Sequence, residues 1–80
     1  MSSKNTISEY FIGYADLSGR GEVMVEHYSA ESAYDCIKQC LNSHDIYVHS
    51  DVDTVEGLFS LARHRNKIIS FPRKVKITII

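Results

Sequence analysis

TISEYFIGYADLSGRGEVMVEHY, residues 6–28, is the stretch of sequence that decides the fold. Residues 6–15 are rich in aromatic and β-branched side chains, and residues 22–28 alternate between apolar and acidic side chains. Both patterns are typical of β-strands. The intervening segment 16–21 contains glycines, which accept the positive φ angles of a hairpin loop. The stretch therefore predicts an antiparallel hairpin.

Both faces of the first strand are apolar, since Tyr10, Ile12 and Tyr14 point to one side and Phe11 to the other. One layer of helices covers only one face of a sheet, so either the hairpin curls to bury both sides or an apolar patch stays open. We expect an open patch, because a single core in a chain of this size is marginally stable. The residues assigned to this aromatic surface are Tyr10, Ile12, Tyr14 and Tyr28, with Met24 beside them.

Two helices and two further strands are expected after the hairpin. A helix over 30–42, with Ser29 as its N-cap, follows from apolar residues at helical spacing. A second helix over 53–65 begins with a capping-box-like Asp-x-x-Glu sequence. Between them, the short apolar run 46–48 predicts a brief strand, and the alternating segment 71–79 predicts a final one.

The expected order of elements is ββαβαβ in a single α+β domain that spans residues 1–80. No repeat, low-complexity tract or linker divides the chain. Because at least one connection between strands contains a helix, the sheet is expected to be mixed but mainly antiparallel. The simplest arrangement has two layers, with both helices on one face of the sheet.

Composition excludes several classes of protein. The chain has 80 residues, of which 44% are hydrophobic and 24% charged, and this balance is typical of a folded domain. No run approaches the roughly 20 apolar residues that span a bilayer. The opening residues lack the apolar run of a signal peptide, so we expect a cytoplasmic protein that does not associate with membranes. Two cysteines, Cys36 and Cys40, are expected to be free thiols.

Charge is divided unevenly along the chain. Residues 1–60 contain all ten acidic residues and only three of the nine cations, for a formal charge of −7. Residues 61–80 contain six cations and no acid, for a formal charge of +6. Such asymmetry suggests an anionic partner, although folding can also bring the two blocks together.

The basic segment 63–76 is therefore a candidate nucleic-acid or anion interface. Phosphate neutralisation by lysine and arginine drives non-specific nucleic-acid binding. However, the pI of 6.4 is low for a nucleic-acid-binding domain, so this function is the alternative rather than the first choice. The residues assigned to the interface are Arg63, Arg65, Lys67, Arg73, Lys74 and Lys76.

Cys36, Cys40 and His44 recur at intervals of four residues and form the one group of soft metal ligands in the sequence. On a continuous helix, the first and last of them are roughly 12 Å apart along the axis, too far to share one ion. We therefore expect no metal site and no cofactor. A small enzyme that uses His27, His49 or Cys40 is a third possibility, but no pairing of these residues is specific enough to predict catalysis.

These observations favour a non-catalytic protein-binding or regulatory module, expected to be a homodimer, that uses the aromatic surface for self-association or for binding a partner. The charge separation is expected to orient the partner and to raise the association rate. A small inhibitor or antagonist of a larger enzyme, of the kind carried by phages and mobile elements, fits this description. The sequence names no particular partner.

Overall fold

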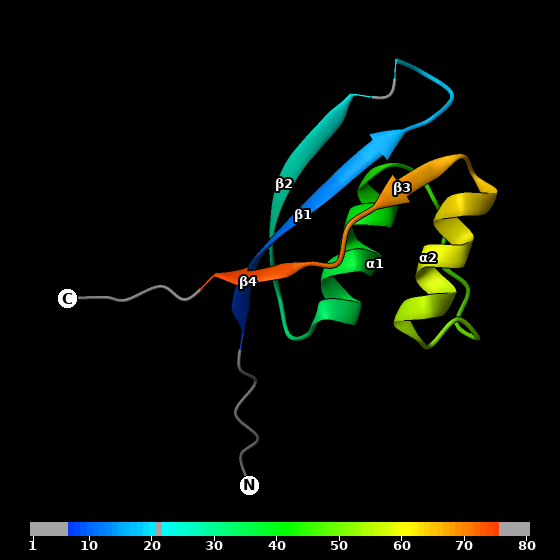
Figure 1. The fold of residues 1–80 in the computed structure, drawn as a ribbon. Coiled ribbons are helices and arrows are strands. Elements are labelled where there is room, and N and C mark those ends of the chain that lie inside the picture. Colours follow the sequence, from blue (N-terminus) through cyan, green and yellow to red (C-terminus); the bar gives the residue numbers. More distant parts are fainter. Residues whose placement is uncertain (1–6, 21, 76–80) are drawn as a thin grey trace, which may run out of the picture.

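The structure is a computed structural model that describes residues 7–20 and 22–75. Two strands come first, two helices follow, and two short strands complete the described chain (Figure 1). The elements are β1 (Ser8–Asp16), β2 (Val23–Ala30), α1 (Ala33–Ser43), α2 (Val55–His64), β3 (Lys67–Ile69) and β4 (Arg73–Val75).

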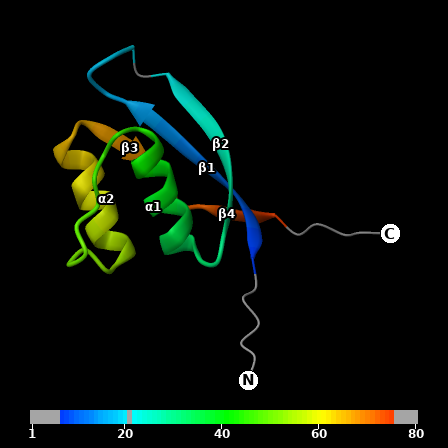
Figure 2. The same cartoon turned by 180° about the vertical axis from the view of Figure 1, so that it is seen from behind.

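The predicted α+β class, with four strands and two helices on one face, is confirmed. Strand β1 is central: β2 pairs along one of its edges, and β3 and β4 pair along the other. Each of these described pairings is antiparallel, and both helices lie in the single connection between β2 and β3. Figures 1 and 2, which view the molecule from opposite sides, show α1 and α2 together on one side of the hairpin.

Strands β3 and β4 are two parts of one strand that is interrupted by a bulge. Along β3, Tyr14 pairs with Ile69. Continued in that register, Phe11 would face Pro72, but it pairs with Arg73, one residue later. One extra residue within 70–72 therefore shifts the ladder, and proline, which lacks an N–H, lies within the shift. The predicted final strand thus begins earlier, at 67, and its end lies outside the described residues.

The predicted strand at 46–48 is not formed, since these residues join no ladder in the described chain. Ile46 and Val48 are nevertheless buried in the core, while Tyr47 between them is exposed. An extended loop that packs its first and third side chains inward shows the same three-residue alternation of buried and exposed side chains as a strand. The run therefore contributes to the core without hydrogen bonding to the sheet.

Both helices begin at side-chain caps that were not the expected ones. The Ser32 hydroxyl accepts from Asp35 N–H at 3.1 Å and caps α1. Ser29, the expected cap, belongs to β2 and pairs there with Glu9. The Thr54 hydroxyl accepts from Gly57 N–H at 3.0 Å and caps α2. The second strand therefore extends further than its alternation indicated, which moves the start of α1 toward the C-terminus.

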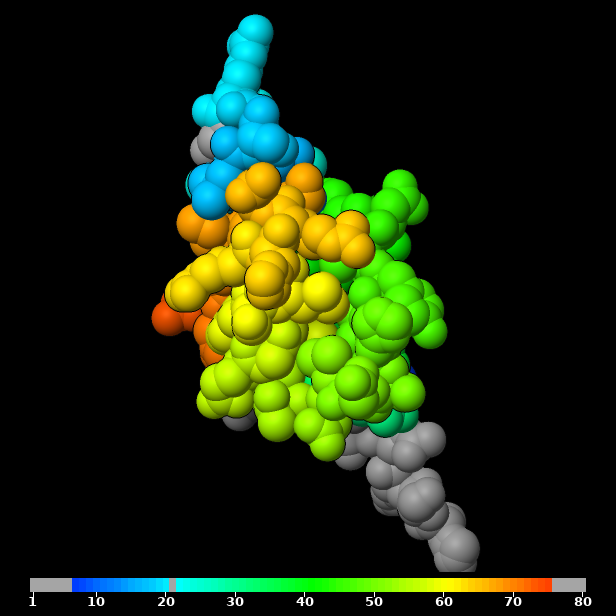
Figure 3. Space-filling model, turned by 90° about the vertical axis from the view of Figure 1, so that its right-hand side faces the viewer, coloured from blue at the N-terminus to red at the C-terminus, as the bar shows by residue number. Residues whose placement is uncertain are grey.

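The core lies between one face of β1 and the two helices. Ile12 on β1, Ile37 and Leu41 on α1, and Leu58 on α2 are among the largest fully buried side chains. In Figure 3, α2 and the chain that leads to it cover the sheet, whereas the loop end of the hairpin extends beyond them. The helical layer thus leaves part of the hairpin uncovered.

Truncation on the two faces of the sheet should have unequal effects. Ile12 is 1% exposed and Ile68, on the other face, is 50% exposed. We expect Ile12→Ala to lower the free energy of unfolding by about 2–5 kcal/mol. Ile68→Ala, the matched control, should lower it by less than about 1 kcal/mol. Urea unfolding followed by circular dichroism measures both, and equal losses would contradict the assignment of faces.

Candidate functional site

The expected aromatic surface is not exposed. Tyr10, Ile12 and Tyr14 are buried against the helices as part of the core. Tyr28 points to the same side and is partly buried. The prediction that these four residues form an open patch is wrong, because the helices cover this face of β1. Both faces of β1 are apolar, so the sequence did not show which face the helices would cover.

The exposed apolar surface lies on the other side of the sheet. Residues opposite each other in an antiparallel ladder share a face, so Phe11, Val23 and Val25 point away from the helices. Val23 and Val25 are 70% and 71% exposed. Ile68, opposite Ala15 on β3, continues this surface and is half-exposed. We call the surface made by Phe11, Val23, Val25 and Ile68 the open face.

Strand β2 is an edge strand whose outer backbone groups can be assigned. Gly13 N–H donates to Ser70 Oγ at 2.8 Å, and its carbonyl accepts from Ser70 N–H at 2.9 Å, so both groups point away from β2. The residue opposite Gly13 in the ladder is Val25. When a residue points its N–H and C=O away from the neighbouring strand, the residue opposite it also points its own N–H and C=O away. Val25 therefore turns these groups outward, and every second residue of β2 does the same. Val23, Val25 and His27 therefore present their backbone groups at the edge.

Within residues 22–75, this edge is closed at the end nearer Ser29. The carbonyl of Ser29, the next outward-facing residue, accepts a hydrogen bond from Gln39 Nε2 on α1 at 2.8 Å. Among the described residues, no partner is found for the outward backbone groups of Val23, Val25 and His27. The available edge is thus a short segment centred on Val25, and we call it the free edge.

The predicted cationic residues include two on β4 that point to opposite faces of the sheet. Arg73 lies on the side of Phe11, whereas Lys74 lies on the side of Tyr10. Lys67 forms an ion pair with Asp16 at 3.1 Å, so its charge is already neutralised. Arg63 and Lys67 share a groove of about 230 Å³ with apolar neighbours. Arg65 is exposed at the end of α2, and Lys76 lies outside the described residues.

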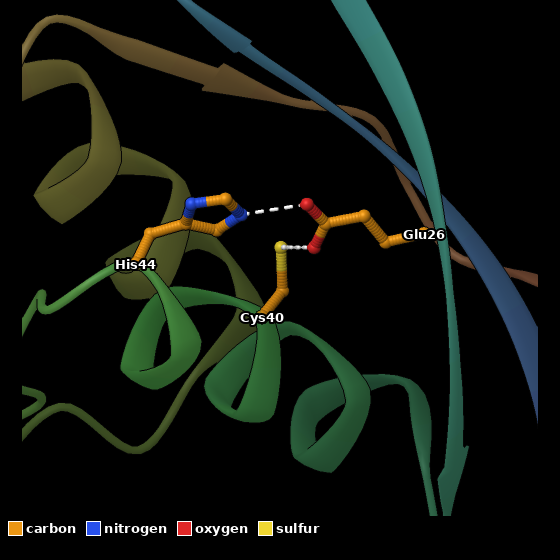
Figure 4. A group of neighbouring side chains, drawn as sticks. All are labelled: Glu26, Cys40 and His44. Atoms are coloured by element: carbon orange, nitrogen blue, oxygen red, sulfur yellow. Dashed lines mark hydrogen bonds and ion pairs between the residues drawn. The ribbon is translucent and has the colours of Figure 1, made fainter.

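Polar side chains with catalytic or metal-binding potential meet on the helix side of β2 (Figure 4). Glu26 points from β2 toward Cys40 and His44, which lie one turn apart at the end of α1. One carboxylate oxygen lies 2.7 Å from His44 Nε2, and the other accepts from Cys40 Sγ at 3.6 Å. We call these three residues the Glu26 cluster.

Neighbouring side chains fix the Glu26 cluster in place. Tyr28 OH donates to Glu26 Oε1 at 2.6 Å and also lies 2.7 Å from Ser43 Oγ. The ring of His44 stacks on Tyr14, with centroids 3.6 Å apart and planes inclined by 4°. Two of the tyrosines expected to bind a partner therefore orient polar groups inside the fold.

The ionisation of the cluster follows from these contacts. Burial on its own raises the pKa of Glu26, but hydrogen bonds from Tyr28 and His44 outweigh burial and hold that pKa below its usual range. Burial, together with the negative charge of Glu26, raises the pKa of the Cys40 thiol to about 12. Burial likewise raises the pKa of Cys36 to about 11.

The cluster is poorly suited to nucleophilic catalysis by cysteine. Both thiols are protonated at neutral pH, and the thiolate is the reactive form. His44 bonds to Glu26 rather than to the sulfur, so it is not placed to deprotonate Cys40. His27, another candidate base, pairs with Glu9 at 2.8 Å on the open-face side, and His49 is exposed.

Sequence reasoning found two members of the cluster and missed the third. Cys40 and His44 were recognised by their spacing, but Glu26 is 14 residues before Cys40 and on a different element. One weak signal was present: Glu26 occupies the same face of β2 as Tyr28, although the acidic Glu22 shares this face. An acid on the buried face of a strand indicates a specific partner.

No known protein family, curated protein or solved structure matches this chain. Neither described helix has the length and apolar character needed to cross a bilayer. The free edge and the Glu26 cluster are the two local features of the described chain with functional potential.

Stability at acidic pH should depend on Glu26. Its folded-state pKa is depressed, so its stabilising contribution is present at neutral pH and is lost as pH falls through that pKa. We expect Glu26→Gln to lose less stability than the wild type between about pH 5 and pH 2. Glu22→Gln, at an exposed position, should follow the wild type. Urea unfolding across this range tests the prediction, which fails if the Glu26→Gln and wild-type curves are parallel.

Proposed function

We propose that this chain is a non-catalytic protein-binding module that forms a homodimer by pairing the free edge of β2 with the same edge of a second copy. Strand addition at a sheet edge is a common mode of protein recognition, in which backbone hydrogen bonds supply affinity and alternate side chains supply specificity. The observation that supports this proposal is the short segment of outward backbone groups at Val23, Val25 and His27.

The free edge is self-complementary. A two-fold axis beside Val25 pairs this residue with its own copy and pairs Val23 with His27 of the second copy, and conversely. All of these residues turn their N–H and C=O outward, so the pairing forms about six backbone hydrogen bonds. Isologous contacts of this kind are the usual basis of two-fold dimers.

Side chains favour the same register. On the open face, the register centred on Val25 places this residue against Val25 of the second copy. On the other face, the same register places Met24 against Glu26 of the second copy. A register centred on His27 would oppose two histidines and would need the Ser29 carbonyl, which Gln39 already occupies. The register centred on Val25 is therefore the best match to both backbone and side chains.

The open face strengthens the case for a partner. Phe11, Val23, Val25 and Ile68 are all substantially exposed, and an unpaired, apolar edge strand favours association. Pairing through β2 joins the open faces of two copies into one larger surface. Inhibition of a larger enzyme, expected from the sequence, stays a prediction about what binds this joined surface. Because the cations are dispersed, nucleic acid is not proposed as a second candidate.

The proposal predicts that charges at the edge abolish the dimer. In the double variant Val23→Lys, Val25→Lys, like charges face each other across the two-fold axis, and such contacts cost several kcal/mol. We expect the wild type to sediment as a dimer at micromolar concentrations. The dissociation constant of the variant should be raised at least about 100-fold.

Two controls separate edge pairing from other contacts. Val23→Thr, Val25→Thr retains β-branched side chains at the same positions and should remain dimeric. Phe11→Lys introduces a charge on the open face away from the edge and should also remain dimeric. A monomeric wild type, or a dimer that survives the lysine pair but not Phe11→Lys, would overturn the proposal.

A further inference from the structure

The Glu26 cluster brings together one oxygen, one sulfur and one nitrogen that can each ligate a metal ion. These atoms, from Glu26, Cys40 and His44, all lie within 4.8 Å of one another. They come from two elements that pack together, β2 and α1, and all three side chains point into the space between them (Figure 4). We propose that this cluster is a Zn²⁺ site.

The ligand atoms are close enough together for one tetrahedral zinc ion, although the Glu26–His44 pair must separate to admit it. Zinc binds sulfur at about 2.3 Å and nitrogen or carboxylate oxygen at about 2.0–2.2 Å, so its ligand atoms lie roughly 3.2–3.8 Å apart. In the structure, the Glu26–Cys40 separation is 3.6 Å and the Glu26–His44 separation is 2.7 Å. The proposal requires the imidazole and the carboxylate to move apart when the ion binds.

The donor set selects the metal. Mg²⁺ and Ca²⁺ prefer all-oxygen sites, whereas a mixed set of thiolate, imidazole and carboxylate suits zinc. The charges also balance, since a carboxylate, a thiolate and a neutral imidazole together neutralise Zn²⁺. No net charge is then buried in a region where an unpaired charge would be costly.

Binding exchanges protons for the metal in a balanced way. The S–H bond of Cys40 breaks, its proton leaves to solvent, and the sulfur forms a bond to zinc. His44 gives up the Nε2 proton that it shares with Glu26, takes one up on Nδ1 from solvent, and coordinates through the freed lone pair of Nε2. The hydrogen bonds from Cys40 and His44 to Glu26 are replaced by zinc–ligand bonds, and no oxidation or reduction is involved.

The surroundings are those of a site with an accessible fourth position. The Glu26 and His44 side chains are 17% and 23% exposed, so an ion can enter from solvent, while Cys40 is fully buried. Among the described residues, the cluster supplies three ligands, and water completes the tetrahedron as in zinc sites with an open position. Tyr14 and Tyr28 act as positioning residues, by ring stacking on His44 and by a hydrogen bond to Glu26.

Zinc added to the purified, metal-free chain tests the proposal. We expect one ion to bind per chain, measured by calorimetry, and the melting temperature to rise by roughly 10 °C at zinc a hundredfold above its dissociation constant. Cobalt bound in place of zinc should show a thiolate charge-transfer band together with the intense visible bands of tetrahedral coordination. The charge-transfer band identifies the sulfur ligand directly.

Matched substitutions distinguish the cluster from other thiols and imidazoles. Cys40→Ala and His44→Gln should each weaken zinc binding by more than about 100-fold, because loss of an outer positioning partner alone costs 10–100-fold. The same substitutions at Cys36 and His49 should leave the affinity unchanged.

Glu26→Gln preserves the size and polarity of the side chain, so it should disturb folding less than the substitutions at Cys40 and His44. Far-ultraviolet circular dichroism verifies the fold of each protein. Absence of stoichiometric binding to the wild type, or equal losses at the control positions, would overturn the proposal and leave the cluster as a hydrogen-bond network only.

Discussion

The pleat of β1 is the constraint on which the rest of the structure depends. This strand pairs along both edges, and side chains opposite each other in a ladder point to the same face of the sheet. The orientation of β1 therefore fixes which side chains of its neighbouring strands face the helices. Once Ile12 and its alternate neighbours turn toward the helices, Glu26 must turn the same way, because the two residues are opposite in the ladder. The position of an acid beside α1 is therefore set by a strand that does not contain it.

The elements with strong periodicity could be predicted from the sequence, but the pairing between them could not. The hairpin and both helices follow from alternation, glycine and helical spacing, and these survive in the structure. The run 46–48 was too short for periodicity to distinguish a strand from a buried loop. The register shift near Pro72 depends on long-range pairing with β1, which no local pattern encodes.

The candidate sites were harder to predict for the same reason. Apolar residues occur on both faces of β1, so composition alone cannot choose the face that the helices cover. Cys40 and His44 were visible as a pair, but Glu26 joins them through tertiary packing. The opposing charge blocks do meet in part, through the ion pair between Asp16 and Lys67, while Arg73 and Lys74 point to opposite faces because side chains alternate along β4.

The bulge between β3 and β4 has a consequence for assembly beyond the proposed dimer. Edges that are straight and unpaired allow sheets to grow without limit, whereas bulges and prolines at an edge prevent it. One edge of this sheet carries the register shift and Pro72, and the other is the short free segment of β2 that ends where Gln39 engages Ser29. In the proposed dimer, pairing would use the β2 edge of each copy. The described part of the other edge is interrupted at Pro72, so we expect a closed assembly rather than fibres.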